Sequence, residues 1–207
     1  MNSLKQKFLI IKLSSIGDIV HALPFLRTLR ANRPNAYIAW IIEESFQDLI
    51  KCNPDLDEVI PVRTRYWRKN INIKSWNEIY QTRKLLKKRQ FDWTFDLQGL
   101  IKTGFIARMT GALNRVGFHR SNCREKINAW FNNHRSKYLS TDSHIVDRCL
   151  SQLSILGDFH PQAEFSLPIR EKDEHISEAF MVKNSKLTKK PIAGINPGAG
   201  FPTKLWS

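Results

Sequence analysis

The fold is decided by residues 8–42, which read FLIIKLSSIGDIVHALPFLRTLRANRPNAYIAWII. The segment opens with an apolar run at 8–11, of the kind found in parallel strands that are buried on both faces. A Ser-Ser-Ile-Gly-Asp turn follows, and apolar residues then recur at helical spacing from Ile19 until the chain reaches the polar stretch 32–35. Residues 37–42 form a second apolar run. A strand, a glycine-containing turn, a helix and a second strand within about forty residues predict a βαβ unit.

The same alternation continues along the chain. It predicts further strands at 58–62, 91–97 and 116–118, and helices at 45–51, 76–89, 102–110 and 145–156. Within the first helix, Pro24 predicts either a position in an early turn or a kink, because a proline deep inside would break the helix. The complete pattern predicts a doubly wound α/β sheet, in which ligands bind beyond the carboxyl ends of the strands.

In the last forty residues the regular alternation of strands and helices is interrupted. An extended segment and a helix at 171–183 precede a lysine-rich linker, and residues 192–195 then resemble the start of another buried strand. A lone strand with the beginning of a helix cannot bury a core, so we expect a second domain that is truncated after its first strand and loop. The expected organisation is a Rossmann-like domain at 1–165, a linker with a helix at 166–190, and the start of a second Rossmann-like domain at 191–207.

Positive charge is concentrated in two blocks of the chain, whose formal net charge is +14. Residues 63–89 contain ten basic side chains against one acidic side chain, and residues 102–137 contain eight against one. Such a field attracts nucleic acid, anionic lipid or a phosphorylated glycolipid. A solvated surface kept for solubility explains either block alone as well. Charge therefore predicts an acidic partner without naming it.

Cysteine usage and hydropathy narrow the class of protein. The three cysteines, Cys52, Cys123 and Cys149, are far apart and form no Cys-x-x-Cys motif, which favours reduced thiols in the cytoplasm over a disulfide framework. No stretch approaches the roughly 18 apolar residues that a membrane span needs. Neither the dinucleotide fingerprint G-x-G-x-x-G nor a P-loop occurs, so a Rossmann dehydrogenase and a P-loop kinase are unsupported.

Three turns beyond predicted strands carry residues that could do chemistry. Asp18 follows Gly17, whose backbone freedom suits a tight turn. Its carboxylate either points into the cleft at the sheet edge or caps the next helix, and spacing alone favours the cap. In the second turn, Asp96 and Gln98 offer hydrogen bonds and Lys102 offers positive charge to an anionic substrate. An ordinary strand-to-helix turn with a surface lysine explains that pattern too.

The third turn, 196–204, places glycines before the start of a helix. Backbone N–H groups and Lys204 would hold a phosphate there, although a plain Gly/Pro loop gives the same pattern. The histidines do not cluster, and no set of His, Cys and Asp has metal-ligand spacing, so no metal site is predicted.

Together these segments resemble the ADP-heptose:lipopolysaccharide heptosyltransferases of glycosyltransferase family 9, and the type I members more than type II. The matching pieces occur in the family's order: IKLSSIGDIVHALP at 11–24, WIIEE at 40–44, VIPV at 59–62, WRK at 67–69, DLQGLIK at 96–102, RE at 124–125, NPGAG at 196–200 and TK at 203–204.

The resemblance implies a GT-B architecture, with residues 1–165 as the acceptor-binding domain and 191–207 as the start of the ADP-sugar-binding domain. It implies an inverting, metal-independent transfer of L-glycero-D-manno-heptose from ADP-heptose to a Kdo residue of Kdo2–lipid A, without a cofactor. Asp18 matches the family's general base. The implied contacts to the donor diphosphate are Gly198, Gly200, Thr203 and Lys204. The implied acceptor-binding residues are Ser15, Gly17, Arg65, Arg68, Lys69, Asp96, Gln98, Lys102 and Arg124.

The resemblance also implies partners and a location. We expect a monomeric, cytoplasmic protein, peripheral to the anionic cytoplasmic face of the inner membrane. Because most of the ADP-sugar-binding domain is missing, we expect the chain alone to be inactive. The alternatives are a type II- or III-like heptosyltransferase acting on another core sugar and, from a different class, a basic nucleic-acid-binding module. The second alternative explains the charge but not the three turns, so no nucleic-acid partner is expected.

Overall fold

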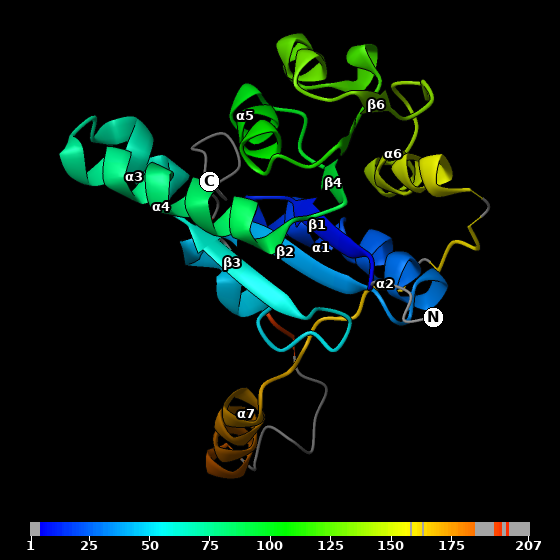
Figure 1. Ribbon diagram of the computed structural model, residues 1–207. Coiled ribbons are helices and arrows are strands. Elements are labelled where there is room, and N and C mark those ends of the chain that lie inside the picture. Colours follow the sequence, from blue (N-terminus) through cyan, green and yellow to red (C-terminus); the bar gives the residue numbers. More distant parts are fainter. Residues whose placement is uncertain (1–4, 158, 163, 185–192, 196–197, 199–207) are drawn as a thin grey trace. The chain divides into compact units, whose positions relative to one another are not determined.

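The computed structural model of the chain describes residues 5–157, 159–162, 164–184, 193–195 and 198. Two compact units are formed, Met1–Pro168 and Ile169–Ser207. The first unit holds a six-stranded sheet with helices on both faces (Figure 1). Its strand order is β3-β2-β1-β4-β5-β6, and all neighbouring strands run parallel. The predicted Rossmann-like α/β class is therefore confirmed.

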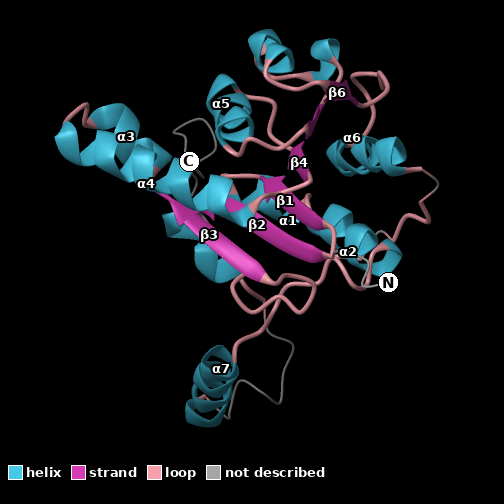
Figure 2. Cartoon of the chain, viewed as in Figure 1, coloured by secondary structure: helices cyan, strands magenta, loops and turns pink. Residues whose placement is uncertain are grey.

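The strands are short and follow the predicted apolar runs. Their bounds are β1 Lys7–Ile11, β2 Tyr37–Glu43, β3 Glu58–Val62, β4 Trp93–Asp96, β5 Asn114–Gly117 and β6 His134–Arg135. Figure 2 shows them as a central layer between helices. The α-helices are α1 Ile16–Val20, α2 Leu23–Asn32, α3 Thr64–Lys69, α4 Ile73–Arg89, α5 Ile101–Met109, α6 Ile145–Leu150 and α7 Glu171–Lys183. The 3₁₀ helices are η1 Glu44–Leu49, η2 Arg120–Asn122, η3 Lys126–Trp130 and η4 Ser151–Leu156.

Several details differ from the predictions. The first helix is split into α1 and α2, because Pro24 lies in the first turn of α2, where its missing N–H needs no partner. The predicted helix at 45–51 is the 3₁₀ helix η1, and the one at 145–156 changes from α6 to 3₁₀ geometry in η4. Helix α3 and strand β6 were not predicted. Of the strand predicted at 192–195, residues 193–195 are described and are not assigned to a strand, and residue 192 lies outside the described residues.

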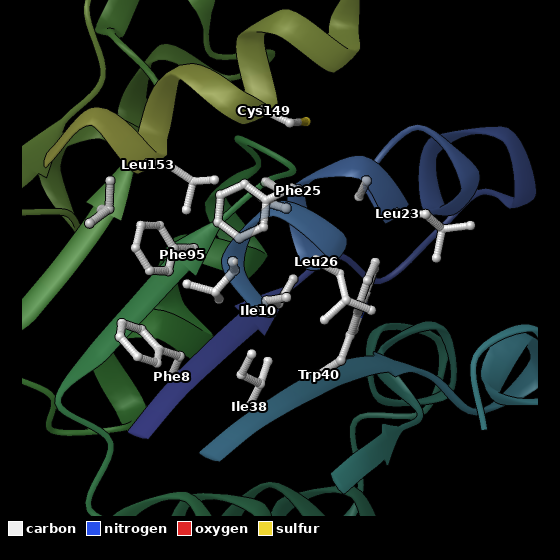
Figure 3. Close-up of a cluster of buried hydrophobic side chains, with 14 of the residues drawn as sticks. Phe8, Ile10, Leu23, Phe25, Leu26, Ile38, Trp40, Phe95, Cys149 and Leu153 are labelled. Carbon is white, nitrogen blue, oxygen red and sulfur yellow. The ribbon is translucent and has the colours of Figure 1, made fainter. Parts of the chain in front are cut away.

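The core consists of two layers, one on each face of the sheet. Alternate residues of one strand point to opposite faces, so Phe8 and Ile10 pack toward α2 and α6, while Leu9 and Ile11 pack toward α4 and α5. Figure 3 shows the first layer, in which Phe25 and Leu26 of α2 meet Phe95 of β4 and Trp40 of β2. Burial on both faces explains why the strands are continuous apolar runs.

The strand order creates a crevice at one end of the sheet. The chain moves outward from β1 through β2 to β3, returns to β4 beside β1, and then moves outward on the other side through β5. The loops after β1 and β4 therefore diverge at the carboxyl ends of two adjacent strands. This reversal is the place where open α/β sheets bind their ligands.

Candidate active site

A pocket of about 320 Å³ lies at this reversal point. The residues that line it come from the loops after β1, β4 and β5 and from α6, and they are Lys12, Asp18, His21, Leu97, Gln98, Phe118, Asn122, Arg124, Ile145 and Arg148. Three of these side chains are basic and one is acidic. The pocket therefore surrounds a single carboxylate, that of Asp18, with positive charge.

The two carboxylate oxygens of Asp18 have different surroundings. Oδ2 accepts hydrogen bonds from the backbone N–H (3.1 Å) and the hydroxyl (3.3 Å) of Ser15, at the start of α1. Oδ1 lies 3.9 Å from the ammonium of Lys12 and 3.5 Å from the guanidinium of Arg124. Asp18 thus caps α1 with one oxygen and presents the other to the basic side of the pocket. The helix-cap and pocket interpretations of Asp18 are both correct, each for one oxygen.

Lys12 is a buried cation directly behind this carboxylate. It follows the last residue of β1, is only 3 % exposed, and donates a 2.6 Å hydrogen bond from Nζ to the backbone oxygen of Leu97. The ammonium joins the loop after β4 to Asp18 in the first turn of α1. A charge buried this far needs such partners to offset the cost of its lost hydration.

Gln98 fixes the loop that leads from β1 to α1, the helix that carries Asp18. Its Oε1 accepts hydrogen bonds from the backbone of Leu13 (2.7 Å) and Ser14 (3.4 Å), and its Nε2 donates to the Ser14 oxygen at 2.5 Å. The indole of Trp40 on β2 donates a 2.9 Å hydrogen bond to the backbone oxygen of Lys12. Because both ends of the Gln98 amide are engaged, its geometry supports the loop and leaves little for an acceptor, the role implied by resemblance.

Asp96 lies outside the pocket and is fully buried. Its carboxylate accepts hydrogen bonds from the backbone of Gln98 (3.0 Å) and Gly99 (3.1 Å) and from the side chains of Thr103 (2.9 Å) and Asn128 (2.5 Å). Burial raises the pKa of Asp96, and these hydrogen bonds oppose the shift. The expected direct contact between Asp96 and the acceptor does not fit this position, because the side chain has no exposed surface. Asp96 instead shapes the turn after β4.

Arg124 is placed over the pocket by the turn after β4. Gly99 has a φ of +70°, and a Cβ there would lie 3.2 Å from the ring of Phe118 and 3.4 Å from the Arg124 nitrogen. The carbonyl of Gly99 accepts from the Glu125 backbone at 3.0 Å, and the Glu125 carboxylate caps α5 through the Ile101 N–H at 2.5 Å. Both contacts hold the segment that carries Arg124 close to Asp18.

A second pocket of about 290 Å³ lies between α3, α4 and α5. Its walls are mostly apolar, formed by side chains such as Trp67, Phe105 and Met109, and its basic residues are Arg65, Arg68 and Lys102. Burial lowers the pKa of Lys102; Arg68 and Arg65 lower it further, while Glu43 counteracts them. Five of the predicted acceptor residues therefore line the two pockets, Gln98 and Arg124 the first and Arg65, Arg68 and Lys102 the second.

Comparison with known proteins identifies the family. The family model "Glycosyltransferase family 9 (heptosyltransferase)" matches residues 79–207. The chain belongs to glycosyltransferase family 9. It is similar to lipopolysaccharide heptosyltransferase 1 of Pseudomonas aeruginosa, with 33% identity over 147 residues, which cover 69% of this chain and 40% of that relative.

Solved structures of the family have the same fold. The Escherichia coli heptosyltransferase WaaC with ADP-2-deoxy-2-fluoro heptose matches with a TM-score of 0.67 and 26% identity, over 86% of this chain and 54% of that one. A family 9 glycosyltransferase from Veillonella parvula matches with a TM-score of 0.80 and 22% identity, over 99% and 58%. The chain thus spans about half the length of the family 9 proteins that it matches.

Three other acceptor-binding residues implied by the family resemblance, Ser15, Gly17 and Lys69, line neither pocket. Ser15 begins α1 as its N-cap, and Lys69, at the end of α3, is exposed. The backbone freedom of Gly17 was expected to suit a tight turn before Asp18. Its φ is not positive, however, and a Cβ there would meet no atom within 4 Å. Gly17 lies inside α1, so the conformation there does not use that freedom, and the space beside its Cα is open.

The family's implied diphosphate contacts cannot be placed. Gly200, Thr203 and Lys204 lie outside the described residues, and Gly198 is described as exposed. Within the described part of the chain, no group of three or more His, Cys, Asp or Glu side chains could hold a metal ion. Over the same residues, no helix is long and apolar enough to cross a membrane.

Sequence reasoning missed several residues of the first pocket. Lys12 had a visible signal, since a lysine between the apolar run 8–11 and Leu13 is unusual at a buried strand end. Helical spacing allows His21 to lie on the same side as Gly17, but a lone histidine more often packs or caps than catalyses, and Arg148 had no signal. They reach the pocket from α1's end and from α6, and only the packing of α6 on α2 brings them together.

Proposed function

We propose that the chain supplies the acceptor side and the general base of an inverting heptosyltransferase of lipopolysaccharide inner-core assembly. The observation that carries this proposal is the position of Asp18. In a family 9 chain, a carboxylate stands at the reversal point of the sheet, with Oδ1 facing a pocket. A carboxylate is one of the groups that act as general bases, and open α/β sheets bind their ligands at this place, which supports the proposal.

The proposed reaction uses these groups as follows. The Asp18 carboxylate takes the proton of an acceptor hydroxyl, and the oxygen attacks the anomeric carbon of the heptose on its free face. The bond from that carbon to the ADP oxygen breaks, ADP leaves with the electron pair, and the configuration inverts. Lys12 and Arg124 hold the carboxylate in place, and Gln98 keeps its loop still.

We assign the Kdo region of Kdo2–lipid A as the acceptor. Its carboxylates and phosphates match the basic residues of the two pockets, which include Arg124 in the first and Arg65, Arg68 and Lys102 in the second. Charge-assisted hydrogen bonds from guanidinium groups suit such anions. The sugar hydroxyl would enter the first pocket, and the more distant anionic groups would lie toward the second. The protein would then work at the cytoplasmic face of the inner membrane, as a monomer.

The donor ADP-heptose belongs to the other half of the proposed site. Gly198, Gly200, Thr203 and Lys204 are proposed to offset the charge that develops on the diphosphate, without a metal ion. Because the chain spans about half the length of its relatives, the 207 residues alone are expected to bind acceptor but not to transfer heptose.

A chimera tests the proposal. Residues 1–168 would replace the matching part of the E. coli type I relative, and heptose transfer from ADP-heptose to Kdo2–lipid A would be measured. Asp18→Asn is expected to lower kcat by about 10²- to 10⁴-fold, the usual contribution of a general base. Acceptor affinity should change little. The matched control is Asp142→Asn, which makes the same substitution at an exposed aspartate far from Asp18 in the sequence. Full turnover by the Asp18 variant would remove the general-base assignment.

The acceptor is tested separately. Transfer to Kdo2–lipid A but not to its heptosylated product supports type I activity, whereas the reverse preference indicates a type II- or III-like enzyme. The nucleic-acid alternative would require steeply salt-dependent DNA binding and no binding of lipid A oligosaccharide. Membership of family 9 gives that alternative no support.

A further inference from the structure

One side of α4 exposes apolar residues to solvent. Ile73, Trp76 and Tyr80 are three and four residues apart, so they lie along the same side of the helix. Their side chains are 89%, 64% and 59% exposed, and Ile71, just before the helix, is 81% exposed. A row of large apolar side chains is an unusual feature of a protein surface that contacts only water.

The same side of α4 becomes cationic toward its carboxyl end. Arg83 and Lys87 continue the three- and four-residue spacing, and Lys84 and Lys88 flank them; all four are exposed. The opposite side of the helix supplies Ile79, Leu85 and Leu86 to the core layer under the sheet. The outer row is therefore not the core-facing side of the helix, and it combines apolar and basic halves along one line.

Acidic side chains are nearly absent from this region. Glu78 is the only acidic residue between 63 and 89. It is held by Arg63 and by the indole of Trp67, whose hydrogen bond to it is 2.8 Å long. The outer side of α4 thus carries no carboxylate to oppose an anionic partner.

We propose that the outer side of α4 docks on an anionic lipid bilayer. Ile71, Ile73, Trp76 and Tyr80 enter the headgroup layer, where tryptophan and tyrosine are enriched in membrane proteins. Arg83, Lys84, Lys87 and Lys88 face anionic headgroups, whose negative surface potential attracts them. A partner helix would cover the apolar half, but only an extended anionic surface matches both halves of the row.

Docking here would place the second pocket at the membrane. Ile79, on the inner side of the same helix, lines that pocket together with Arg65 and Arg68 of α3. A lipid-linked acceptor would then meet these arginines close to the bilayer. Only this last step rests on the proposed function; the docking itself needs no transferase activity.

Co-sedimentation of the 207-residue chain with vesicles tests the docking. The vesicles contain phosphatidylcholine alone or with about one third phosphatidylglycerol, an anionic lipid. Binding is expected to be strong only on the anionic vesicles and to weaken with salt. The double variant Ile73→Ser/Trp76→Ser should lower the partition coefficient by about tenfold or more. Its matched control is Leu113→Ser/Trp130→Ser, which removes an equally exposed apolar pair elsewhere and should change little.

A second pair of variants tests the charged half. Lys84→Gln/Lys87→Gln should lower binding by about fivefold for each lysine removed. Lys126→Gln/Lys137→Gln, an exposed pair in the other basic block, should have a much smaller effect. Circular dichroism of every variant checks that the fold is retained, which surface positions should allow.

The outcomes separate docking from catalysis. Equal losses in the α4 variants and their controls, or equal binding to both kinds of vesicle, would overturn the docking proposal. So would a concentration-dependent dimer that Ile73→Ser/Trp76→Ser dissociates, since the apolar row would then bind a second copy. The vesicles contain neither donor nor sugar acceptor. Loss of transfer by the chimera, with vesicle binding intact, would therefore count only against the proposed function.

Discussion

The ion pair between Lys12 and Asp18 should contribute more to stability than the shorter pair between Arg124 and Asp18. The distances to Asp18 Oδ1 are 3.9 Å from Lys12 and 3.5 Å from Arg124. The lysine side chain is 3% exposed, however, and the arginine side chain is 62% exposed. Burial, and not distance, is expected to decide which ion pair contributes more to stability, because water screens the exposed pair.

The expected magnitude follows from Coulomb's law. Two charges 3.9 Å apart interact by about 4 kcal/mol at an effective dielectric constant of about 20. Contact of Asp18 with water reduces this value, so we expect a coupling free energy of about 1 to 2 kcal/mol between Lys12 and Asp18. For Arg124 and Asp18 we expect about 0.5 kcal/mol or less, as measured for exposed pairs.

Double-mutant cycles measure both couplings. Urea unfolding of the chain would be followed for Lys12→Met, Arg124→Met, Asp18→Asn and the two double variants. Lys12→Met alone should cost about 1 to 3 kcal/mol, since the hydrogen bond to the Leu97 oxygen is lost as well. The reasoning fails if the Arg124 cycle gives the larger coupling, or if the Lys12 effects are additive within about 0.5 kcal/mol.

Three further outcomes are expected. Burial acts to raise the pKa of Glu58, but hydrogen bonds and charge from α4 and β2 outweigh it and lower the pKa. Its stabilising effect should therefore be complete above the ordinary pKa of about 4.3 and be lost as pH falls through the lowered value. Glu58→Gln should flatten the pH dependence of unfolding in that range, and an unchanged acid slope would contradict this. Gly99→Ala should lower the unfolding free energy by about 1 to 2 kcal/mol because of its positive φ, measured by urea titration; a neutral effect would refute the strain. Burial raises the pKa of Cys123 and of Cys149 to about 11, so a thiol reagent at pH 8 should label the exposed Cys52 first, and equal labelling rates would contradict the burial.

Much of the fold could be predicted from sequence because its strands are buried on both faces. Continuous apolar runs such as 8–11 and 37–42 give an unambiguous signal, and the polar turns between them mark the ends. Helix α3 gave no such signal: residues 64–69 read TRYWRK, without an apolar period. The division into α1 and α2 could be predicted only in part. Pro24 indicated an early turn or a kink, but not that a second helix would begin beside it.

The site could be predicted only in part, because the exposure of a side chain at the sheet edge depends on tertiary packing. Asp18 lies shortly after the buried strand β1 and Asp96 ends the buried strand β4, so the sequence pattern does not distinguish their roles. Their surroundings differ mainly because of residues distant in sequence: Asn128 donates a hydrogen bond to the buried Asp96, whereas Arg124 lies 3.5 Å from Asp18 in the lining of the pocket. Local pattern finds a carboxylate at the sheet edge, and only tertiary packing decides whether it meets solvent.

The hydrogen bond from Trp40 to the Lys12 oxygen gives the chain a built-in reporter. The indole is fully buried, and its N–H can exchange with solvent deuterium only when the peptide after β1 moves away. Its proton resonance would therefore measure how often the Asp18 loop opens, without any label or substitution. A bound sugar donor or sugar acceptor that tightens the loop would slow the exchange of the Trp40 indole N–H, although the ligand would not contact Trp40.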